Sequence, residues 1–536
     1  MKFKVCILAA GIGSRMGLLT KKISKTLLPI DSKAVLSHII EKFNPNVEIV
    51  IAVGHLKETI TEYLACAHVG RKIQIVEVDK YTGTGSGPGF SLLQCRPFLE
   101  APFIFFASDT LVLEDIPPPT TNWLGVAPVL NTKDYCSAAI SNGLITRLDD
   151  KIESVNRSAF IGLAGVKDYE IFFNSLEKDT EIINEELQVS NGFKSLIDLD
   201  LNANYFTWYD TGNMKGYVHA NEEFTASGYN IDFSKPDEFL YFVGNNVIKF
   251  FADKKIVKNR YKRSKILKDL CPEIIHITNS FYAYEKQEGK VLYDIVNDRV
   301  MKNFIQWLDK QLWDRKVLSG SDLAVFQKAC FDFYYKKTLS RLNTYHKKHS
   351  IKDQTTLINE VRVPSIKHML GLINWDEINY GIPSNFHGDL QFDNVLLKDD
   401  GSFLLLDWRQ DFSRIVDYGD QYYDISKLNG GLQVSYKLVK QDQFRFYEND
   451  SGEITVEHNL PEELVSAKKI LNEFVEEKNL DMAKIEIMTS LIYLNMSPMH
   501  HAPFNHFIYN FGKLSLYKAL LKYSHLGADS LQHQPV

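Results

Sequence analysis

The chain has 536 residues, more than one hydrophobic core usually supports, so we expect two or three domains. Hydrophobic residues make up 45% of the chain and charged residues 24%, which is typical of globular proteins and excludes a disordered or fibrous chain. A formal net charge of −6 gives no reason to expect nucleic acid as a partner.

The cysteines and the hydropathy predict a soluble cytoplasmic protein. The six cysteines are scattered without a CxxC pair, so we expect reduced thiols. The apolar run at residues 5–10 is shorter than a signal-peptide core and leads into a Gly/Arg loop, which favours a buried strand. No stretch approaches the roughly 20 apolar residues that span a bilayer, so we expect no membrane partner. A homo-oligomer is compatible with this composition.

Short apolar strands alternate with helices in the first 225 residues. We expect strands at 4–10, 47–53, 73–78 and 103–107, and helices at 33–43, 57–65, 89–98 and 217–224. This alternation is typical of βαβ units around a mostly parallel sheet. The sequence therefore predicts an α/β domain over residues 1–226.

A different pattern begins near residue 236. We expect strands at 239–243, 246–251 and 280–286, a basic helix at 258–270, mainly helices from 298 onward, and a surface hairpin within 441–459. The pattern predicts a second, α+β domain over residues 227–536. Its small sheet would span about 236–295 and its helical lobe about 296–526.

A glycine-containing loop follows the first predicted strand. Gly11 and Gly13 allow a tight turn that brings backbone N–H groups close to phosphate oxygens. Arg15 and Lys25 add charge-assisted contacts to a triphosphate, and we expect both to act in catalysis. The predicted nucleotide-binding residues of this loop are Leu8, Ala10, Gly11, Gly13 and Ser14.

Residues 8–16, LAAGIGSRM, together with 25–29, KTLLP, resemble the sugar-1-phosphate nucleotidylyltransferases and the related phosphocholine cytidylyltransferases. The pattern of those families is L-A-A-G-x-G-S/T-R followed by P-K-x-L-L-P. Ser24 stands where they have the first proline, which alters the stiffness of the loop and not its chemistry. The resemblance covers residues 1–225 and implies a Rossmann-like (GT-A-type) fold.

Further matches to these families follow in chain order. Gly83, Thr84 and Gly85 match the segment that lies beside the base and ribose. Asp109 ends a predicted strand, and Asp210 lies in the run WYDTG; the resemblance implies that these two carboxylates hold Mg²⁺. Such an ion aligns an acceptor phosphate with the α-phosphorus of a nucleoside triphosphate and neutralises their charge.

Three residues are candidates for binding the acceptor. Lys151 matches a lysine that contacts the acceptor phosphate in the family, although a solvated surface lysine explains it equally well. Gly162 and Asn191 are predicted to line the acceptor pocket, with core packing as the alternative for each.

The C-terminal third carries a second signature. His387-Gly388-Asp389, Asn394 and Asp407 flank two apolar strands, so a short loop gathers an acid and metal ligands at one edge. This pattern resembles the aminoglycoside phosphotransferase and choline kinase superfamily, which implies a two-lobed protein-kinase-like fold. By that resemblance Asp389 is the catalytic base and Asn394 and Asp407 hold Mg²⁺ on ATP.

The residues that would bind ATP at this second site match the superfamily pattern less completely than the catalytic loop does. Lys249 matches the strand lysine that pairs with the α- and β-phosphates, with a solvent-facing lysine as the alternative. The same resemblance implies that Glu285 lies in the hinge between the two lobes, which would offer backbone groups to adenine. The helix at 258–270 contains no glutamate to pair with Lys249, so Asp269, Glu273 or no residue takes that role.

The two signatures together predict a bifunctional enzyme. One half would phosphorylate a small hydroxylated metabolite, preferably a sugar, with ATP and Mg²⁺. The other half would couple the product to CTP or UTP, with Mg²⁺, and release pyrophosphate, giving a nucleotide-activated precursor for surface glycan such as capsule. A choline or amino-alcohol kinase fused to a CTP:phosphocholine-type cytidylyltransferase is the first alternative. The second is that only one domain is catalytic and the other is a regulatory or binding module.

Overall fold

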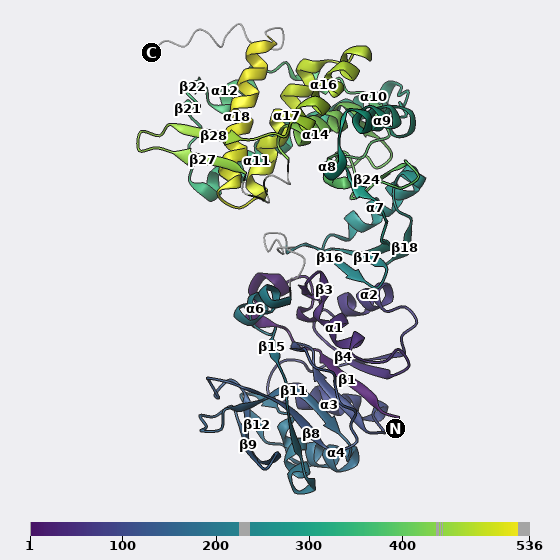
Figure 1. Cartoon of the computed structure of the whole chain (residues 1–536), viewed down its shortest axis with the longest axis vertical. Coiled ribbons are helices and arrows are strands. Elements are labelled where there is room, and N and C mark those ends of the chain that lie inside the picture. Colours follow the sequence, from purple (N-terminus) through teal and green to yellow (C-terminus); the bar gives the residue numbers. More distant parts are fainter. Residues whose placement is uncertain (1, 225–235, 436–438, 440, 442, 524–536) are drawn as a thin grey trace. The chain divides into compact units, whose positions relative to one another are not determined.

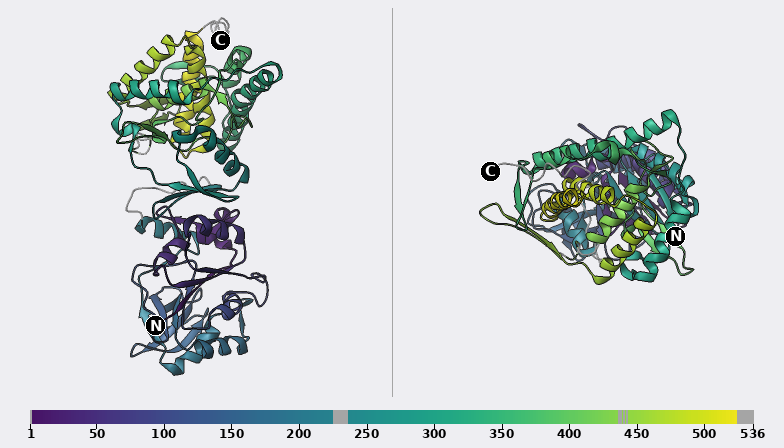
Figure 2. Two further views of the ribbon diagram at one scale, coloured as in Figure 1. Left: turned by 90° about the vertical axis from the view of Figure 1, so that its right-hand side faces the viewer. Right: turned by 90° about the horizontal axis from the view of Figure 1, so that it is seen from above.

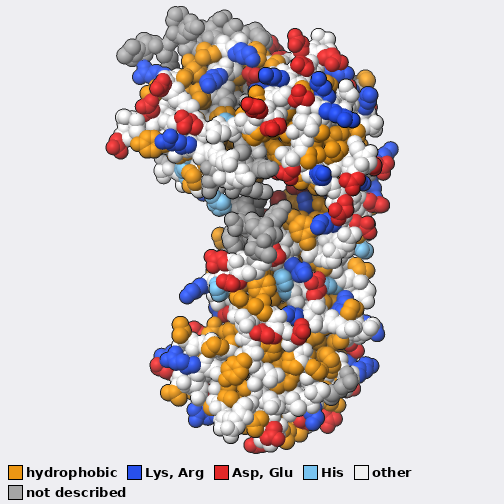
Figure 3. All heavy atoms as spheres, in the orientation of Figure 1, with side chains coloured by type: hydrophobic (Ala, Val, Ile, Leu, Met, Phe, Trp, Pro, Cys, Tyr) orange, Lys and Arg blue, Asp and Glu red, His pale blue; other side chains and the backbone are white. Residues whose placement is uncertain are grey.

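The computed structural model describes the chain except residues 1, 225–235, 436–438, 440, 442 and 524–536. The chain divides into two compact units, Met1–Lys254 with Ile275–Tyr284 and Lys255–Ile274 with Glu285–Val536. The predicted boundary at 226–227 and the predicted lobe end at 526 lie outside the described residues. On the face drawn in Figure 3, acidic and basic side chains are interspersed, in keeping with the small net charge.

A nine-stranded sheet forms the centre of the first unit (Figure 1). Its parallel part consists of β5 (Ile73–Glu77), β4 (Glu48–Val53), β1 (Lys4–Ala9) and β6 (Phe103–Ala107), which confirms the four predicted strands. The sheet continues through β11 (Ser158–Val166), β8 (Trp123–Pro128), β14 (Asn202–Tyr205), β10 (Leu144–Asp150) and β9 (Cys136–Ser141). Of these pairings only β8 with β14 is parallel, so the sheet is mixed rather than mostly parallel. The tight connection between β9 and β10 requires antiparallel pairing.

Helices cover both faces of this sheet. Successive side chains of β1 point to opposite faces, so Val5 and Ile7 join one apolar layer and Cys6 joins the other. The first layer includes α1 (Val35–Glu41) and α2 (Lys57–Ala67), and the second includes α3 (Pro88–Cys95) and α4 (Tyr169–Lys178). The remaining helices of this part are α5 (Ser190–Phe193) and α6 (Met214–Phe224).

A four-stranded sheet packs against the first of these layers. It consists of β16 (Glu238–Val243), β17 (Asn246–Phe251), β19 (Phe281–Glu285) and β18 (Ile274–Ile277). Buried side chains from β16, β17 and β19 belong to the same core as α1 and α2. The rings of Tyr241 and Tyr63 meet edge to face, 5.1 Å apart. The sequence pattern predicts that these strands belong with the C-terminal half, whereas their apolar residues pack in the core of the first unit.

The second unit is mainly helical, and Figure 2 shows its last helices lying side by side. Its helices are α7 (Lys254–Leu267), α8 (Leu292–Ile295), α9 (Asp298–Trp307), α10 (Gly320–Phe331), α11 (Lys337–His349), α12 (Ile366–Gly371), α13 (Trp375–Asn379), α14 (Gln421–Gln433), α16 (Glu462–Glu477), α17 (Met482–Met496) and α18 (Phe504–Lys522). Nearly every residue of α14 is buried, as expected for a helix at the centre of a bundle. Among the described helices, none has the length and apolar character needed to cross a membrane.

Short strands complete the second unit. They are β20 (Lys290–Val291), β21 (Thr356–Ile358), β22 (Val361–Val363), β23 (Pro383–Ser384), β24 (Val395–Leu397), β25 (Phe403–Leu405), β26 (Gly419–Asp420), β27 (Phe444–Glu448) and β28 (Ile454–His458). The antiparallel pair of β27 and β28 confirms the predicted hairpin. The antiparallel pair of β24 and β25 follows the His-Gly-Asp loop directly.

The buried hydroxyl of Tyr241 provides a test of how strongly β16 is held against the rest of the first unit. It donates a hydrogen bond to the carbonyl oxygen of Leu27 at 2.9 Å. We expect Tyr241→Phe to destabilise the first unit by about 1 kcal/mol, because the buried carbonyl loses its partner. Scanning calorimetry should then show one transition lowered by roughly 2–4 °C. Tyr205→Phe, at an exposed position on β14, is the control and should leave the transition unchanged. Equal transition temperatures in the two variants would show that the hydrogen bond from Tyr241 to Leu27 does not stabilise the first unit.

Candidate functional sites

The loop after β1 is shaped by a glycine. Gly13 has a φ of 69°, and a Cβ there would lie 3.0 Å from the Cβ of Lys25. A side chain at this position would therefore be strained and would displace Lys25. The loop continues into a 3₁₀ helix, Ser14–Thr20, and Lys25 begins another, Lys25–Leu27. Gly13 thus allows the loop to pack directly against the lysine.

Strand pairing brings Asp109 and Asp210 together. β1 and β6 are parallel, with Leu8 opposite Ala107, so the loop after β1 and Asp109 lie at the same edge of the sheet. β7 (Thr110–Val112) pairs with β15 (Trp208–Asp210), and Asp210 lies opposite Thr110. A Cβ on Gly212 would lie 2.5 Å from Asp109 Oδ2 and 3.0 Å from Asp210 Oδ1. The two carboxylates therefore face the same small space.

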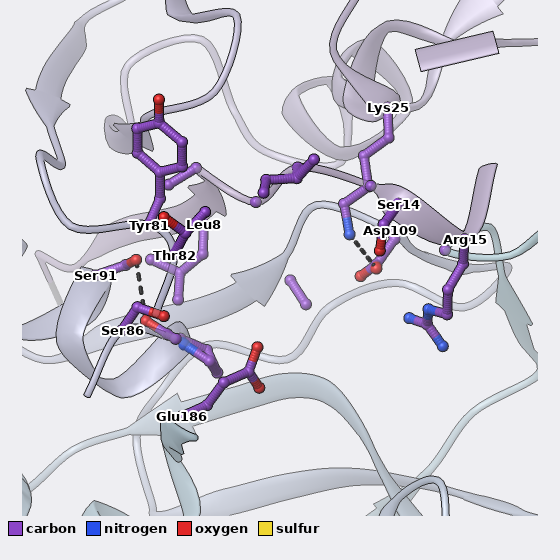
Figure 4. Close-up of a pocket in the computed structure, with 18 of the residues that line it drawn as sticks. Leu8, Ser14, Arg15, Lys25, Tyr81, Thr82, Ser86, Ser91, Asp109 and Glu186 are labelled. Carbon is purple, nitrogen blue, oxygen red and sulfur yellow. Dashed lines mark hydrogen bonds and ion pairs between the residues drawn. The ribbon is translucent and has the colours of Figure 1, made fainter. Parts of the chain in front are cut away.

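Cationic side chains surround Asp109. Lys25 Nζ lies 2.6 Å from Asp109 Oδ2, and Figure 4 shows this ion pair with Arg15 beside it. Within the described chain the Arg15 guanidinium forms no hydrogen bond or ion pair, and its Nη2 would be 3.2 Å from a Cβ on Gly212. Both cations are placed to contact an anionic ligand at the two carboxylates.

The two carboxyl groups differ in acidity. Burial opposes ionisation of Asp109, but Lys25 and Arg15 outweigh it and hold the pKa below its ordinary value. Burial raises the pKa of Asp210, and the negative charge of Asp109 raises it further. Asp210 accepts hydrogen bonds from the Gly212 N–H at 2.8 Å, the Tyr135 hydroxyl at 3.2 Å and the Asn213 amide at 2.9 Å. Neither Tyr135 nor Asn213 was predicted from the sequence.

These residues suit a divalent cation. Carboxylate oxygens are the ligands that Mg²⁺ prefers, and it is usually held by one or two carboxylates plus substrate phosphates. Among the described residues, no group of three or more His, Cys, Asp and Glu side chains is arranged so that it could hold a metal ion by itself. A pair of carboxylates beside free space fits an ion that arrives with a phosphorylated ligand.

Two adjoining pockets open at this edge of the sheet. The larger has a volume of about 540 Å³ (Figure 4). Predicted residues that line it are Leu8, Ala10, Gly11, Gly13, Ser14, Arg15, Lys25, Gly83 and Asp109. The smaller, of about 240 Å³, is lined by Lys151, Gly162 and Asp210. Arg15 and Asp109 line both pockets, so the carboxylate pair lies where the two meet.

Some predicted residues lie outside these pockets. Thr84 and Gly85 do not line the larger one; the Gly85 N–H donates to the Glu185 carbonyl, and α3 begins only at Pro88. Asn191 is fully buried, and its amide donates to backbone carbonyls of Asp179 and Glu181. Its neighbour Ser190 lines the smaller pocket in its place.

A second group of polar side chains surrounds the His-Gly-Asp loop. The Asn394 amide donates to the Asp389 carbonyl at 2.9 Å, and the Leu406 N–H donates to the Asn394 carbonyl at 2.8 Å. These bonds place Asp389, Asn394 and Asp407 around one loop, as their order in the sequence predicts. Asp407 has a φ of 55° and forms an ion pair with Arg260 of α7.

Lys427 of α14 lies 2.7 Å from Asp389 Oδ1. Burial opposes ionisation of Asp389, but the charge of Lys427 outweighs it and holds the pKa below its ordinary value. Asp389 is therefore a carboxylate at neutral pH. Lys427 was not predicted from the sequence, because α14 also carries Asp424, Ser426 and Asn429 and its pattern therefore does not mark the lysine as buried.

His387 supports the loop as a neutral side chain. Burial lowers its pKa to about 4. Its Nε2 donates to the Leu406 carbonyl at 2.7 Å, so its Nδ1 accepts the N–H of Asp389 at 3.3 Å. Asp424 accepts the N–H groups of His387 and Gly388 at 2.7 and 2.6 Å. Asp424 thus holds the backbone of the loop in place.

The remaining residues predicted for this site lie on separate elements. Lys249 is on β17 and Glu285 ends β19. Arg263, on α7, donates a hydrogen bond to the Phe386 carbonyl oxygen. Its guanidinium carbon also lies 3.8 Å from the centre of the Phe386 ring. Of the acids considered as partners of Lys249, Glu273 lies 4.0 Å from Lys265.

Comparison with known proteins finds a family model and curated relatives that match part of the chain. Residues 5–114 match the family model of the MobA-like NTP transferase domain. A bifunctional protein GlmU from Methanococcus vannielii is 29% identical over 41% of this chain and 54% of its own length. The chain thus spans about half the length of this curated relative.

Two solved structures are also similar to this chain. UDP-glucose pyrophosphorylase complexed with UDP-glucose is 20% identical, with a TM-score of 0.37, over 42% of this chain and 98% of its own. CTP:phosphocholine cytidylyltransferase from Streptococcus pneumoniae is 18% identical, with a TM-score of 0.36, over 42% and 99%.

Gly212 provides a test of the carboxylate pair. A methyl group at this position would contact both carboxylates. We expect Gly212→Ala to weaken Mn²⁺ binding at one class of site by roughly 10–100-fold, as loss of support around a metal site usually does. Titration followed by electron paramagnetic resonance measures this. Gly371→Ala is the control, because a Cβ there meets open space. Unchanged Mn²⁺ binding in Gly212→Ala would show that the pair does not hold a cation.

Proposed function

We propose that the first unit is a nucleotidylyltransferase that joins a phosphorylated acceptor to a nucleoside triphosphate. The main observation is that Asp109 and Asp210 converge at the junction of two pockets, with Lys25 and Arg15 beside them. The match of residues 5–114 to the MobA-like NTP transferase domain supports the same activity. The larger pocket would hold the nucleotide and the smaller one the acceptor.

The residues of this site can perform the transfer without a protein nucleophile. An oxygen of the acceptor phosphate forms a bond to the α-phosphorus, and the bond from that phosphorus to the bridging oxygen of pyrophosphate breaks. Lys25 and Arg15 neutralise the triphosphate and orient it for in-line attack. Asp109 and Asp210 would hold Mg²⁺, which supplies further charge neutralisation when bound. Lys151, in the smaller pocket, would bind the acceptor phosphate.

We propose that the second unit is a small-molecule phosphotransferase that uses ATP. It is supported by the convergence of Asp389, Asn394 and Asp407 on one loop and by the ionised state of Asp389. Asp389 would accept the proton of the acceptor hydroxyl as its oxygen bonds to the γ-phosphorus and ADP leaves. Asn394 and Asp407 would hold Mg²⁺, and Asp407 would then leave Arg260.

The two activities form one reaction sequence. The second unit would phosphorylate a hydroxylated metabolite such as a sugar, and the first would activate the product with CTP or UTP. The product would be a nucleotide-linked precursor for surface glycan. Because both reactions use soluble nucleotides, we expect the protein to act in the cytoplasm.

Two substitutions separate the activities. We expect Asp389→Asn to lower ADP formation by roughly 100-fold or more, because the base is lost. Pyrophosphate release from supplied phosphomonoesters should persist in this variant. Asp109→Ala should have the converse effect, since only the first site loses a metal ligand. The two products are measured separately, across a panel of acceptors and all common nucleoside triphosphates.

Matched variants serve as controls. Asp399→Asn and Asp115→Ala replace exposed aspartates close in sequence to each site and should leave both activities intact. If either Asp389→Asn or Asp109→Ala abolished both activities, the chain would not contain two independent sites.

A further inference from the structure

Cationic side chains gather beside Asp389 in the second unit. Lys337 and Arg341 come from α11, Arg409 follows β25, and Lys427 comes from α14. Lys337 Nζ lies 4.1 Å from the centre of the Phe333 ring, and the guanidinium carbon of Arg409 lies 4.9 Å from the same centre. One aromatic ring thus gathers cations from two separate segments of the chain.

These charges are not balanced by the protein around them. Asp389 is already paired with Lys427 at 2.7 Å. Within the described chain, the charged groups of Lys337, Arg341 and Arg409 form no hydrogen bond or ion pair, and Arg409 Nε is buried without a partner. Burial lowers the pKa of Lys337 well below its usual value, and Arg409, Arg341 and Lys427 lower it further. Asp389 is the carboxylate that most opposes this effect.

Such an arrangement is unfavourable in the empty protein. Bringing like charges together and removing them from water costs free energy that a structural role would not require. A bound anion offsets this cost, and arginine forks hold carboxylates and phosphates with paired hydrogen bonds.

We propose that Lys337, Arg341 and Arg409 bind an anionic group, a carboxylate or a phosphate, on the acceptor whose hydroxyl reacts at Asp389. This inference rests on the phosphotransferase function proposed above and specifies its substrate class. The acceptor hydroxyl oxygen forms a bond to the γ-phosphorus, its proton passes to Asp389, and the γ-phosphorus separates from ADP. A cationic acceptor, such as an amino alcohol, would be repelled by the same side chains.

The first test measures anion binding without turnover. Inorganic phosphate is added to the full-length protein, and the rise in melting temperature gives the affinity. We expect Lys337→Gln and Arg341→Gln to bind phosphate roughly tenfold more weakly or worse, because each loses a charge-assisted contact. Lys336→Gln is the matched control, since the neighbouring Lys336 is exposed and paired with Asp332. Equal phosphate binding in all these proteins would overturn the inference.

The second test compares acceptors of different charge on the unmodified protein. Glycerate, glycerol and choline are offered with ATP and Mg²⁺, and ADP formation is measured. We expect kcat/KM for glycerate to exceed that for glycerol by roughly tenfold or more, with choline the poorest. Lys337→Gln and Arg341→Gln should raise KM for glycerate and leave KM for ATP unchanged. A raised KM for ATP would instead assign the cluster to the nucleotide and overturn the inference.

The outcomes also distinguish a failure of the anionic-acceptor inference from a failure of the proposed phosphotransferase function. If choline or glycerol reacts better than glycerate, and Asp389→Asn abolishes the reaction, the phosphotransferase function is supported and the anionic acceptor is contradicted. If no acceptor yields ADP in an Asp389-dependent way while phosphate binding still depends on Lys337 and Arg341, the anion site stands and the phosphotransferase function falls.

Discussion

A lysine within hydrogen-bonding distance of a carboxylate is the interaction on which each site depends. Lys25 holds Asp109 in the first unit, and Lys427 holds Asp389 in the second. In both cases burial alone would favour the neutral carboxyl group, and the lysine reverses that preference. A metal ligand and a proton acceptor both need the ionised form. The surrounding structure therefore has to hold a lysine within hydrogen-bonding distance of each of these two acids.

The two units achieve this by different means. In the first, parallel strands end at a common edge, and a left-handed glycine lets the loop after β1 contact Lys25 directly. In the second, the buried helix α14 carries Asp424 and Lys427 three residues apart, so both lie on one face. Asp424 binds the backbone of the His-Gly-Asp loop while Lys427 binds the side chain of Asp389. A single helical turn thus positions the loop and sets the charge of its acid.

Local features of the sequence explain why some of this architecture was predictable. The strands that form the parallel part of the sheet are short apolar runs between polar turns, and their pattern is readable without tertiary contacts. In the mixed part, β9 and β14 carry small and polar residues, so they lack the apolar run that marks the parallel strands. The packing of Tyr241 on Tyr63 joins residues far apart in the chain, and no local signal marks it.

The site residues divide in the same way. Asp109, Asp210, Asp389 and Asp407 follow apolar strands or lie in recognisable motifs, so their types and positions indicate chemistry. Lys427, Arg260 and Tyr135 act through contacts with distant residues, which only the folded chain brings together. Asn191 is a polar residue of the type that often lines a binding pocket, yet its side-chain amide donates hydrogen bonds to backbone carbonyls. The sequence therefore indicates which acidic residues form the candidate sites. The cations that pair with them are identified only once the chain is folded.

The pairing of Lys25 with Asp109 has a consequence for how ligands enter the first site. A divalent cation that binds between Asp109 and Asp210 competes with Lys25 for Asp109 Oδ2. It also relieves the repulsion between the two carboxylates that contributes to the raised pKa of Asp210. By the proposed function, a triphosphate would offer Lys25 and Arg15 new anionic partners, and Asp109 would then be free to bind the cation. Since each ligand would remove an obstacle to the other, we expect the cation and the nucleotide to bind more favourably together than separately.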